Sequence, residues 1–316
     1  MKKPSAGSYV LALASLASVI GAQGQVLFQD NFDATPASNW IINAATSQDR
    51  AVIGFDYSAV GIPSAPNSGG TTIGAMMQAN RPGGTAALSG VSISPVGQSF
   101  SGDYQLRYDL WASYPGPAPA GGTGSTQLTG AGIMTSGNVA TFAGSGDGLW
   151  FAATADGGSS SDYRAYFNGI NQATASIYPA GGQNSSLAYY TTSFPGGASA
   201  PAAQTASFAQ QTGTTAAGTI GWAWHDVAIT KSGTTVTWDI DGIRVANVDL
   251  TTTPAFGGSN ILFEQSDINA TQTTAANDPV LFGLVDNVRV TAVPEPSTYA
   301  LLSLGGLLVA IRRKKR

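Results

Sequence analysis

One segment, Trp224-His-Asp-Val-Ala-Ile-Thr-Lys-Ser-Gly-Thr-Thr-Val-Thr-Trp-Asp-Ile-Asp-Gly242, indicates the fold class most directly. Large apolar side chains occupy alternate positions on both sides of Ser232-Gly233, namely Val227, Ile229, Val236, Trp238 and Ile240. A period of two places such side chains on one face of a β-strand. Ser-Gly and Asp-Gly pairs are typical of tight turns between strands. The stretch therefore predicts an antiparallel hairpin within 220–248, followed by a third strand over 243–248.

The rest of the body repeats this pattern in short runs separated by Gly-rich turns. The clearest run is 103–111, where one face holds Tyr104, Leu106, Tyr108 and Leu110, and the other holds Asp103, Gln105, Arg107 and Asp109. Further strands are expected near 26–33, 50–56, 72–79, 86–93, 130–136, 148–155, 163–168, 186–194, 260–267 and 280–291. No run shows a helical period, so the chain predicts an all-β, two-sheet antiparallel β-sandwich. The Gly-, Ala- and Pro-rich stretches 115–132 and 194–218 predict long surface loops.

The hairpin also carries a family resemblance. Trp224-His-Asp-Val-Ala-Ile, a Gly-containing turn, and a strand ending in Asp241-Gly242 resemble the signature hairpin of concanavalin A-like and laminin G-like sandwiches. The direct match covers about thirty residues. The resemblance implies a jelly-roll topology and, by analogy, a lectin-like or glucanase-like body. Aromatic runs at 147–151 and 162–166 are then expected to line a concave face.

The carboxyl end holds a second recognisable pattern. Val293-Pro294-Glu295-Pro296 precedes a mostly apolar run, 299–311, and a basic cluster, Arg312-Arg313-Lys314-Lys315-Arg316. Thirteen residues make a helix of about 20 Å, shorter than the ~30 Å hydrocarbon core of a bilayer. The order of motif, hydrophobic helix and basic stop resembles the PEP-CTERM sorting signal of Gram-negative bacteria. This resemblance implies transient inner-membrane association and cleavage near the motif by an exosortase, a membrane protease.

The amino end predicts export as well. Lys2 and Lys3 precede an apolar stretch, 9–20, which small residues follow. That order is typical of a secretory signal peptide, assigned here to 1–24. The expected organisation is therefore a signal peptide, a β-sandwich domain over 25–292, and a sorting segment over 293–316. The expected destination beyond the inner membrane is the cell surface, the outer membrane or the extracellular matrix.

Composition excludes several functional classes. Residues 25–293 hold seventeen acidic side chains against seven basic ones, a net charge of −10. Such a surface does not fit nucleic acid, which demands positive charge. The chain has no cysteine and one histidine, so disulfides and thiolate metal sites are absent and a zinc centre is not expected.

Candidate catalytic residues are few. Glycoside hydrolysis generally uses two carboxyl groups at a set separation, and laminarinase-like relatives carry a Glu-x-Asp-x-(x)-Glu strand. Residues 25–293 contain a single glutamate, Glu264, and lack that strand. Asp239 and Asp241 are an alternative dyad, although their alternation with Trp238 and Ile240 favours a solvent-facing role. His225 is interpreted as a hydrogen-bonded strand residue. The chain is therefore predicted not to be an enzyme.

Calcium is the one ligand ion for which the sequence offers candidates, and no other cofactor is expected. Asp30 and Asp286 each interrupt an apolar face. On the opening strand Asp30 shares a face with Phe28 and Phe32, and on the closing strand Asp286 is expected to share one with Phe282, Leu284, Val288 and Val290. If these strands pair, two carboxylates meet, and Ca²⁺ prefers such oxygen ligands. The alternative is that each acid lies at a strand end or bulge, where it meets water or backbone N–H groups.

Three functions fit these observations. The first is a non-catalytic carbohydrate-binding protein, whose glycan is an exopolysaccharide or another polysaccharide. Hydroxyl- and amide-rich strands and the lectin-like resemblance favour it. The second is a structural or adhesive surface protein without a small ligand. The third is an atypical glycoside hydrolase.

Overall fold

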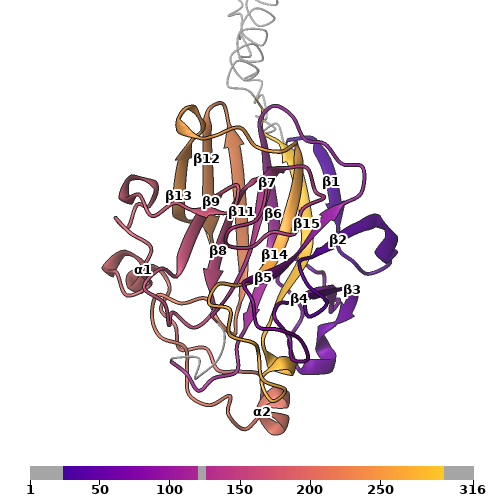
Figure 1. The fold of residues 1–316 in the computed structure, drawn as a ribbon, viewed down its shortest axis with the longest axis vertical. Coiled ribbons are helices and arrows are strands. Elements are labelled where there is room, and N and C mark those ends of the chain that lie inside the picture. Colours follow the sequence, from indigo (N-terminus) through magenta and orange to yellow (C-terminus); the bar gives the residue numbers. More distant parts are fainter. Residues whose placement is uncertain (1–23, 120–125, 295–316) are drawn as a thin grey trace, which may run out of the picture.

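The computed structural model describes residues 24–119 and 126–294, and these form two stacked antiparallel sheets (Figure 1). The first sheet contains, in order, β13 (Ile243–Asp249), β12 (Thr235–Ile240), β11 (Trp224–Ser232), β6 (Tyr104–Ser113), β15 (Phe282–Ala292), β4 (Ile73–Gln78) and β3 (Arg50–Asp56), with β1 (Val26–Asp30) paired to β15. The second contains β10 (Ile170–Asn171), β9 (Tyr163–Phe167), β8 (Leu149–Thr154), β7 (Gln127–Thr135), β14 (Asn260–Asp267), β5 (Ser89–Pro95) and β2 (Trp40–Ala44). The predicted all-β sandwich is confirmed.

The hairpin predicted from 224–242 is present, with its turn one residue later than expected, at Gly233 and Thr234 between the paired residues Ser232 and Thr235. Ile229 pairs with Trp238 across β11 and β12. The next turn joins β12 to β13. There Asp241 and Gly242 both adopt positive φ, 51° and 77°, as a two-residue type I′ turn requires. Val227, Ile229, Val236, Trp238 and Ile240 are all buried between the sheets. Alternation therefore identified both the strands and the face that they bury.

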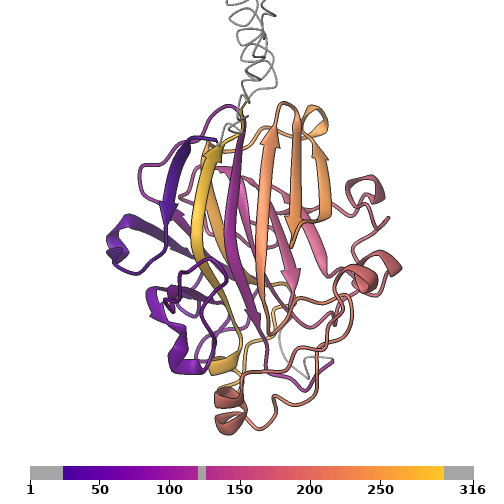
Figure 2. The same cartoon turned by 180° about the vertical axis from the view of Figure 1, so that it is seen from behind.

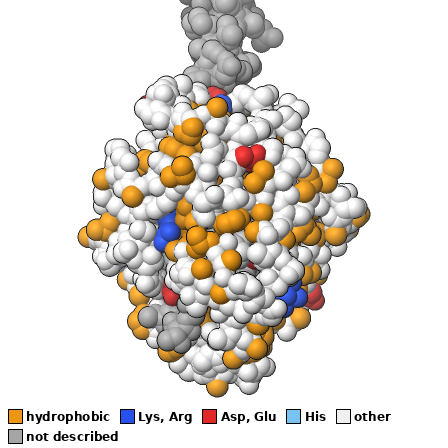
Figure 3. Space-filling view, in the orientation of Figure 1, with side chains coloured by type: hydrophobic (Ala, Val, Ile, Leu, Met, Phe, Trp, Pro, Cys, Tyr) orange, Lys and Arg blue, Asp and Glu red, His pale blue; other side chains and the backbone are white. Residues whose placement is uncertain are grey.

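Large rings from the two sheets meet in the core. Tyr108 of β6 contacts Phe263 of β14 edge-on at 5.0 Å, and Trp238 of β12 stacks on Phe151 of β8 at 5.4 Å. Burying rings of this size contributes strongly to the stability of a sandwich without disulfides. The outer surface carries little charge, as Figure 3 shows for one face of the molecule.

The structure contains short helices that the sequence did not predict. They are α1 (Ala188–Ser193), α2 (Ala202–Ser207) and single 3-10 turns at Ala37–Asn39, Tyr57–Val60, Ala175–Ile177, Leu250–Thr252 and Asp278–Val280. The strand expected at 186–194 is wrong, because α1 occupies it. Its Tyr and Thr residues favour strands, but Tyr190 is buried and stacks on Tyr163 at 4.3 Å, so tertiary packing overrides propensity.

The two expected surface loops are also only partly correct. Strand β7 begins at Gln127, inside the first of them. The second contains α2 and packs against the rest of the protein: Gln211 is buried and its Nε2 donates to the carbonyl of Tyr114 at 2.9 Å. Buried amides of this kind order a loop that composition alone marks as mobile.

The closing strand β15 is the element that shapes the site. Its first half pairs with β4 and its second half with β1, so two different strands share one edge of it. Between the halves, Asn287 has φ 52° and two residues oppose the single residue Tyr108 of β6. This β-bulge bends the strand and reverses which residues face the core. Figure 2 shows β15 beside β6 in the middle of the eight-stranded sheet.

The two ends of the described body lie together. The N–H of Ala292 donates to the carbonyl of Gln25 at 2.8 Å, and the N–H of Val293 donates to the carbonyl of Asp103 at 2.9 Å. Strands β1 and β15, indigo and yellow in Figure 1, therefore run side by side at one pole. The segments predicted for export and sorting are attached at this pole.

Candidate functional site: a polar groove beside the closing strand

An open groove of about 970 Å³ lies where β1, β6 and β15 meet. Its walls come from parts of 28–39, 67–69, 95–98, 107–108 and 287–289. The groove follows from the strand arrangement, because β1 and β4 pair with different halves of β15 and the bulge lies between them. A concave, polar-lined site of this volume is large enough for a small ligand or a few sugar residues.

A row of polar side chains crosses the floor of this groove. Gln29 of β1 pairs in register with Arg289 of β15, and Arg289 pairs with Arg107 of β6. Residues directly opposite each other on neighbouring strands project from the same face, so the amide and the two guanidinium groups form one line. Arg107 forms a bidentate ion pair with Asp226 of β11. We call Gln29, Arg107 and Arg289 the polar row.

Several polar side chains in the groove walls are not committed to other described residues. Within the described residues, the side chains of Gln29, Ser38, Asn39, Gln98 and Arg289 make no hydrogen bond or ion pair. All five are at least partly exposed to solvent. Amide, hydroxyl and guanidinium groups in this state are available to a ligand rich in hydroxyl groups.

The deeper wall is held by a buried carboxylate. Asp109 accepts hydrogen bonds from the backbone N–H and the Nδ2 of Asn67, at 3.0 and 2.7 Å, and from the Nδ2 of Asn287 at 2.8 Å. Three donors compensate for the removal of this group from water. Asp109 thus fixes the 67–69 wall against the bulge.

Asp286 lies directly across from Asp109 and is also buried. Its oxygens accept hydrogen bonds from the hydroxyl of Tyr57 at 2.9 Å and the N–H of Asn287 at 2.7 Å. The pKa of Asp286 is raised to about 7, mainly by burial; the hydrogen bonds from Tyr57 and Asn287 act against the rise, and the nearby carboxylates of Asp109 and Asp33 add to it. Burial likewise raises the pKa of Asp109. The pair therefore holds one proton more readily than two separate carboxylates would.

Asp286→Asn is expected to remove a pH dependence of stability. The folded pKa of about 7 exceeds the ordinary unfolded value of about 3.9, so the folded state binds the extra proton between these values. The contribution of Asp286 alone should therefore lower the stability of the wild-type protein by roughly 2–4 kcal/mol as pH rises from about 4 to 7, in addition to the contributions of other buried acids such as Asp267. The amide N–H of the introduced Asn can donate to the hydroxyl oxygen of Tyr57. The Tyr57 hydroxyl can then donate to the carbonyl of Thr71, which lies 3.1 Å away. Urea unfolding followed by circular dichroism at several pH values measures the slope.

Asp249→Asn is the control for this measurement. Hydrogen bonds from the backbone and side chain of Thr251 lower the pKa of that exposed carboxyl, so its contribution is lost only under acidic conditions. The slope above pH 5 should therefore match that of the wild type. An unchanged slope in Asp286→Asn would show that Asp286 does not carry the extra proton.

The structure does not bring Asp30 and Asp286 together as expected. The first and last strands do pair, but Asp30 lies opposite Val288, while Asp286 lies opposite Asp109. The expectation that Asp286 shares a face with Val288 and Val290 is wrong, because the bulge at Asn287 separates their faces. Asp30 instead accepts hydrogen bonds from Thr35 Oγ1 at 2.6 Å, the N–H of Phe32 at 2.8 Å and Trp40 Nε1 at 2.9 Å.

No group of three or more His, Asp or Glu side chains in 24–119 and 126–294 is arranged to hold a metal ion. Asp30 and Asp286 each have their oxygens occupied by protein donors, as the alternative interpretation of these residues proposed. A calcium site at Asp30 and Asp286 stays a prediction that the geometry does not support.

The outer face of the seven-stranded sheet is closed. Residues 136–148, which we call the strap, lie across it, with hydrogen bonds from Asn43 Nδ2 to the carbonyl of Gly137 and from Ser92 Oγ to the carbonyl of Val139, both 2.9 Å. Beneath the strap, Trp150 and Tyr166 stack at 3.7 Å and are fully buried. The expectation that these aromatic runs line an open concave face is wrong: Trp150 and Tyr166 lie under the strap, and Phe151 and Tyr163 face the core.

Glu264 is buried on that same closed face. Neither of its carboxyl oxygens has a hydrogen-bond partner among the described residues, and burial raises its pKa well above the ordinary value. The register places Glu264 opposite Gly130 and Ser92, with no second acid in that row. The sole glutamate of 25–293 is therefore an enclosed group whose charged form is disfavoured by burial.

The other acid–base candidates are held by structural contacts. His225 Nδ1 lies 2.7 Å from Asp241 Oδ2, and its Nε2 lies 3.0 Å from the carbonyl oxygen of Ile220. Asp239 accepts a hydrogen bond from Arg244 Nε at 2.6 Å. The interpretation of His225 as a hydrogen-bonded strand residue agrees with this geometry, and Asp239 and Asp241 are engaged by different partners.

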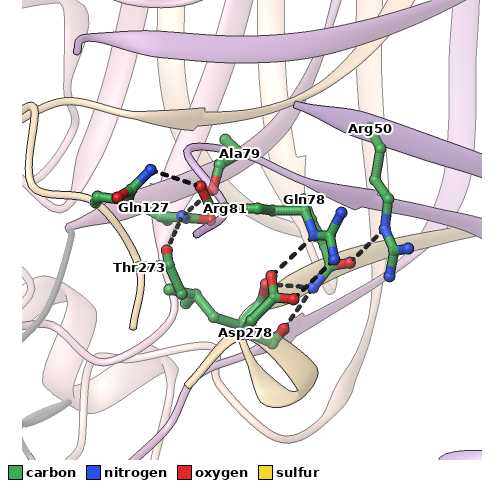
Figure 4. Close-up of polar contacts among 9 residues, drawn as sticks. Arg50, Gln78, Ala79, Arg81, Gln127, Thr273 and Asp278 are labelled. Atoms are coloured by element: carbon green, nitrogen blue, oxygen red, sulfur yellow. Dashed lines mark hydrogen bonds and ion pairs between the residues drawn. The ribbon is translucent and has the colours of Figure 1, made fainter. Parts of the chain in front are cut away.

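A second polar cluster closes the end of the sandwich opposite the termini and is shown in Figure 4. Arg81 forms a bidentate ion pair with Asp278 at 2.8–2.9 Å, and Arg50 Nε donates to Gln78 Oε1 at 2.8 Å. Gln127 Nε2 donates to the carbonyl of Ala79 at 2.7 Å. The labelled side chains bind one another, so this cluster ties β3, β4, β7 and the turn before β15 together rather than presenting free groups.

The family model described as the PEP-CTERM protein-sorting motif matches residues 292–315. The chain carries a PEP-CTERM sorting motif. The sorting prediction is confirmed: the motif indicates secretion through the inner membrane, export to the cell surface and recognition by an exosortase.

The PEP-CTERM segment lies mostly outside the described residues. Val293 and Pro294 are described, whereas Glu295, Pro296, the expected helix 299–311 and the basic residues 312–316 are not, nor is the expected signal peptide except for Gly24. Among the helices of residues 24–119 and 126–294, none is long and apolar enough to cross a membrane.

Solved structures of similar fold include enzymes and a sugar-binding domain. The Crh5 transglycosylase in complex with NAG is 11% identical, with 86% of this chain and 87% of that chain covered and a TM-score of 0.41. The carbohydrate recognition domain of Emp46p, in a metal-free form, is 10% identical, with coverages of 84% and 97% and a TM-score of 0.43. A sialidase is 12% identical with a TM-score of 0.41; the match covers 86% of this chain but only 19% of the sialidase. No curated protein matches the sequence. Similarity at this level does not transfer any of these activities to the chain.

Proposed function

We propose that this PEP-CTERM protein is a cell-surface or extracellular-matrix protein that binds a glycan in the groove beside β15 without cleaving it. The observation that carries the proposal is the open groove of about 970 Å³ with uncommitted amide, hydroxyl and guanidinium groups in its walls. Such groups match the dense hydroxyl pattern of a sugar, and each hydrogen bond to a ligand contributes about 0.5–1.5 kcal/mol. The export that the motif directs would bring this groove to the polysaccharides outside the cell.

The non-catalytic part of the proposal rests on the acids near the groove. Asp30 and Asp109 accept hydrogen bonds on both oxygens, and Asp226 is paired with Arg107. A glycosidase needs one carboxyl group free to donate a proton and a second free to attack or to activate water. Glu264, which the sequence singled out, lies on the other sheet beneath the strap. The domain limits 25–292 and 293–316 stay part of this proposal.

Replacing Gln29 and Gln98 together with Ala is expected to weaken glycan binding about tenfold, because two ligand hydrogen bonds are lost. The processed protein, purified from cells that express the full chain, is applied to a glycan array and to polysaccharide from the same cells. Affinity for the glycans that bind is then measured by isothermal titration calorimetry. Gln210→Ala removes an amide that does not line the groove and donates to the carbonyl of Ala276 at 3.4 Å, and it serves as the control.

The outcomes separate the proposed function from its alternatives. Saturable binding that the Gln29/Gln98 variant loses and Gln210→Ala keeps supports the groove. An absence of binding to every glycan tested would favour a structural or adhesive protein. Release of shortened sugars during incubation would favour an atypical glycoside hydrolase. Repeating the titration with added Ca²⁺ and with chelator shows whether calcium takes part.

A further inference from the structure

The two arginines of the polar row, Arg107 and Arg289, lie opposite each other without an anion between them. Arg107 and Arg289 are cross-strand partners on the outer face of the eight-stranded sheet. Like charges directly opposite on neighbouring strands destabilise a sheet. Residues 25–293 contain only six arginines and one lysine, so placing two of them opposite each other is not explained by charge abundance.

Only one of these charges is neutralised within the described residues. Asp226 pairs with Arg107, whose side chain is still 55% exposed. Arg289 is exposed and makes no hydrogen bond or ion pair there. The neighbouring acids are committed elsewhere: Asp30 to Thr35 and Trp40, Asp33 to Asn31, and Asp109 to Asn67 and Asn287.

The surroundings of Arg289 suit the rest of a sugar ring. Gln29 is its partner on the other side, and Gln98 also lines the groove; neither side chain has a bond within the described residues. A guanidinium group binds a carboxylate through two parallel N–H···O bonds, and an amide beside it can bind ring hydroxyls. A carboxylate at this point would also relieve the repulsion between the two arginines.

We propose that Arg289, with Arg107 beside it, binds the carboxylate of an acidic sugar residue in the glycan; this rests on the proposed glycan-binding function. The net charge of −10 on residues 25–293 disfavours a continuous polyanion at long range. The ligand class is therefore a largely neutral polysaccharide with isolated uronate residues, not a polyuronate.

The test uses a matched pair of probes. One is an oligosaccharide that bears a single glucuronate, and the other is the same oligosaccharide with its carboxyl group reduced to an alcohol. Isothermal titration calorimetry with the processed wild-type protein should show about tenfold tighter binding of the acidic probe, the effect of one charge-assisted bidentate contact. Arg289→Gln should bind both probes equally, at the wild-type affinity for the reduced probe.

Two further variants make the result specific. Arg289→Lys keeps the charge but loses the planar fork, so it should restore only part of the preference. Arg244→Gln removes the same charge from β13, where Arg244 binds Asp239, and should keep the full preference. Equal binding of both probes by the wild type, or an unchanged preference in Arg289→Gln, would overturn the acidic-sugar site while leaving glycan binding intact. If the wild type binds neither probe nor any array glycan, both proposals fail.

Discussion

Trp40→Ala is expected to lower the free energy of unfolding by about 3–5 kcal/mol, the usual cost of removing a buried Trp side chain. Trp40 is 4% exposed and contacts three rings, with centroid distances of 6.1 Å to Phe28, 5.2 Å to Phe32 and 6.0 Å to Phe263. Its Nε1 also donates to Asp30, which would lose one of its donors. Urea unfolding followed by far-UV circular dichroism measures the change.

The same substitution should weaken glycan binding, because Trp40 holds one wall of the groove. Asp30 lies at the end of β1, and its bonds to Trp40, Thr35 and the N–H of Phe32 fix the turn that follows. Trp40→Phe is the matched control: it keeps most of the ring contacts but not the bond to Asp30, so its loss of stability should be smaller. Equal stability of Trp40→Ala and the wild type would show that Trp40 does not join the two sheets.

The sequence predicted the strands whose apolar residues alternate over a full length. The core-facing residues of the hairpin 224–242 and of the run 103–111 were placed correctly, because these apolar side chains alternate with polar ones. The outer face of 103–111 is nevertheless buried at Asp109, which the 67–69 wall covers. Strand β2, which begins at Trp40, was missed. Its residues Trp40-Ile-Ile-Asn-Ala44 include two adjacent isoleucines, and the pattern is too short to reveal a period. Its burial comes from β5 and the core rings, which are distant in sequence.

The groove was not predicted, because it depends on a bulge and on which strands are neighbours. The sequence placed Arg107 on the polar face of 103–111, and this is correct. The partner of Arg107, however, is Arg289, 182 positions later, and only the pairing of β15 with β6 reveals it. For Asp286 the error was an assumed unbroken alternation through 282–290. Asn287, at φ 52°, interrupts it, and Asn tolerates this conformation better than most residues.

The closed face explains why the aromatic runs gave a wrong signal. Trp150 and Tyr166 are paired on neighbouring strands and face the same side, as the rings of a ligand platform would. Nothing local in the sequence shows that the strap covers them. The strap lies very close to the sheet. Gly90 of β5 lies so near Thr141 of the strap that a Cβ at position 90 would come within 2.7 Å of the Thr141 carbonyl oxygen. The open polar surface is therefore on the eight-stranded sheet, where the outward residues are amides, hydroxyls and arginines.

Replacing Pro294, Glu295 and Pro296 together with Ala is expected to stop processing of the carboxyl tail almost completely. The PEP-CTERM match includes these positions, so the substitution removes the residues by which an exosortase would recognise the tail. Mass spectrometry of the protein from native cells should find wild-type protein without Arg316, and the variant with Arg316 in the inner-membrane fraction. Ser297→Ala with Thr298→Ala changes the next two residues and should be processed normally.

The structure adds a spatial condition to this result. Val293 is bonded to Asp103 in the folded body, and only Pro294 separates it from the undescribed tail. A protease that cuts at Glu295 or Pro296 must therefore work within two or three residues of the sandwich, at the pole where β1 and β15 end. If cleavage occurs there, the mature protein keeps the whole of β15 and with it Arg289 and the groove. An intact Arg316 on most of the wild-type protein would instead mean that the tail is retained, and that the groove operates on a protein still held at the inner membrane.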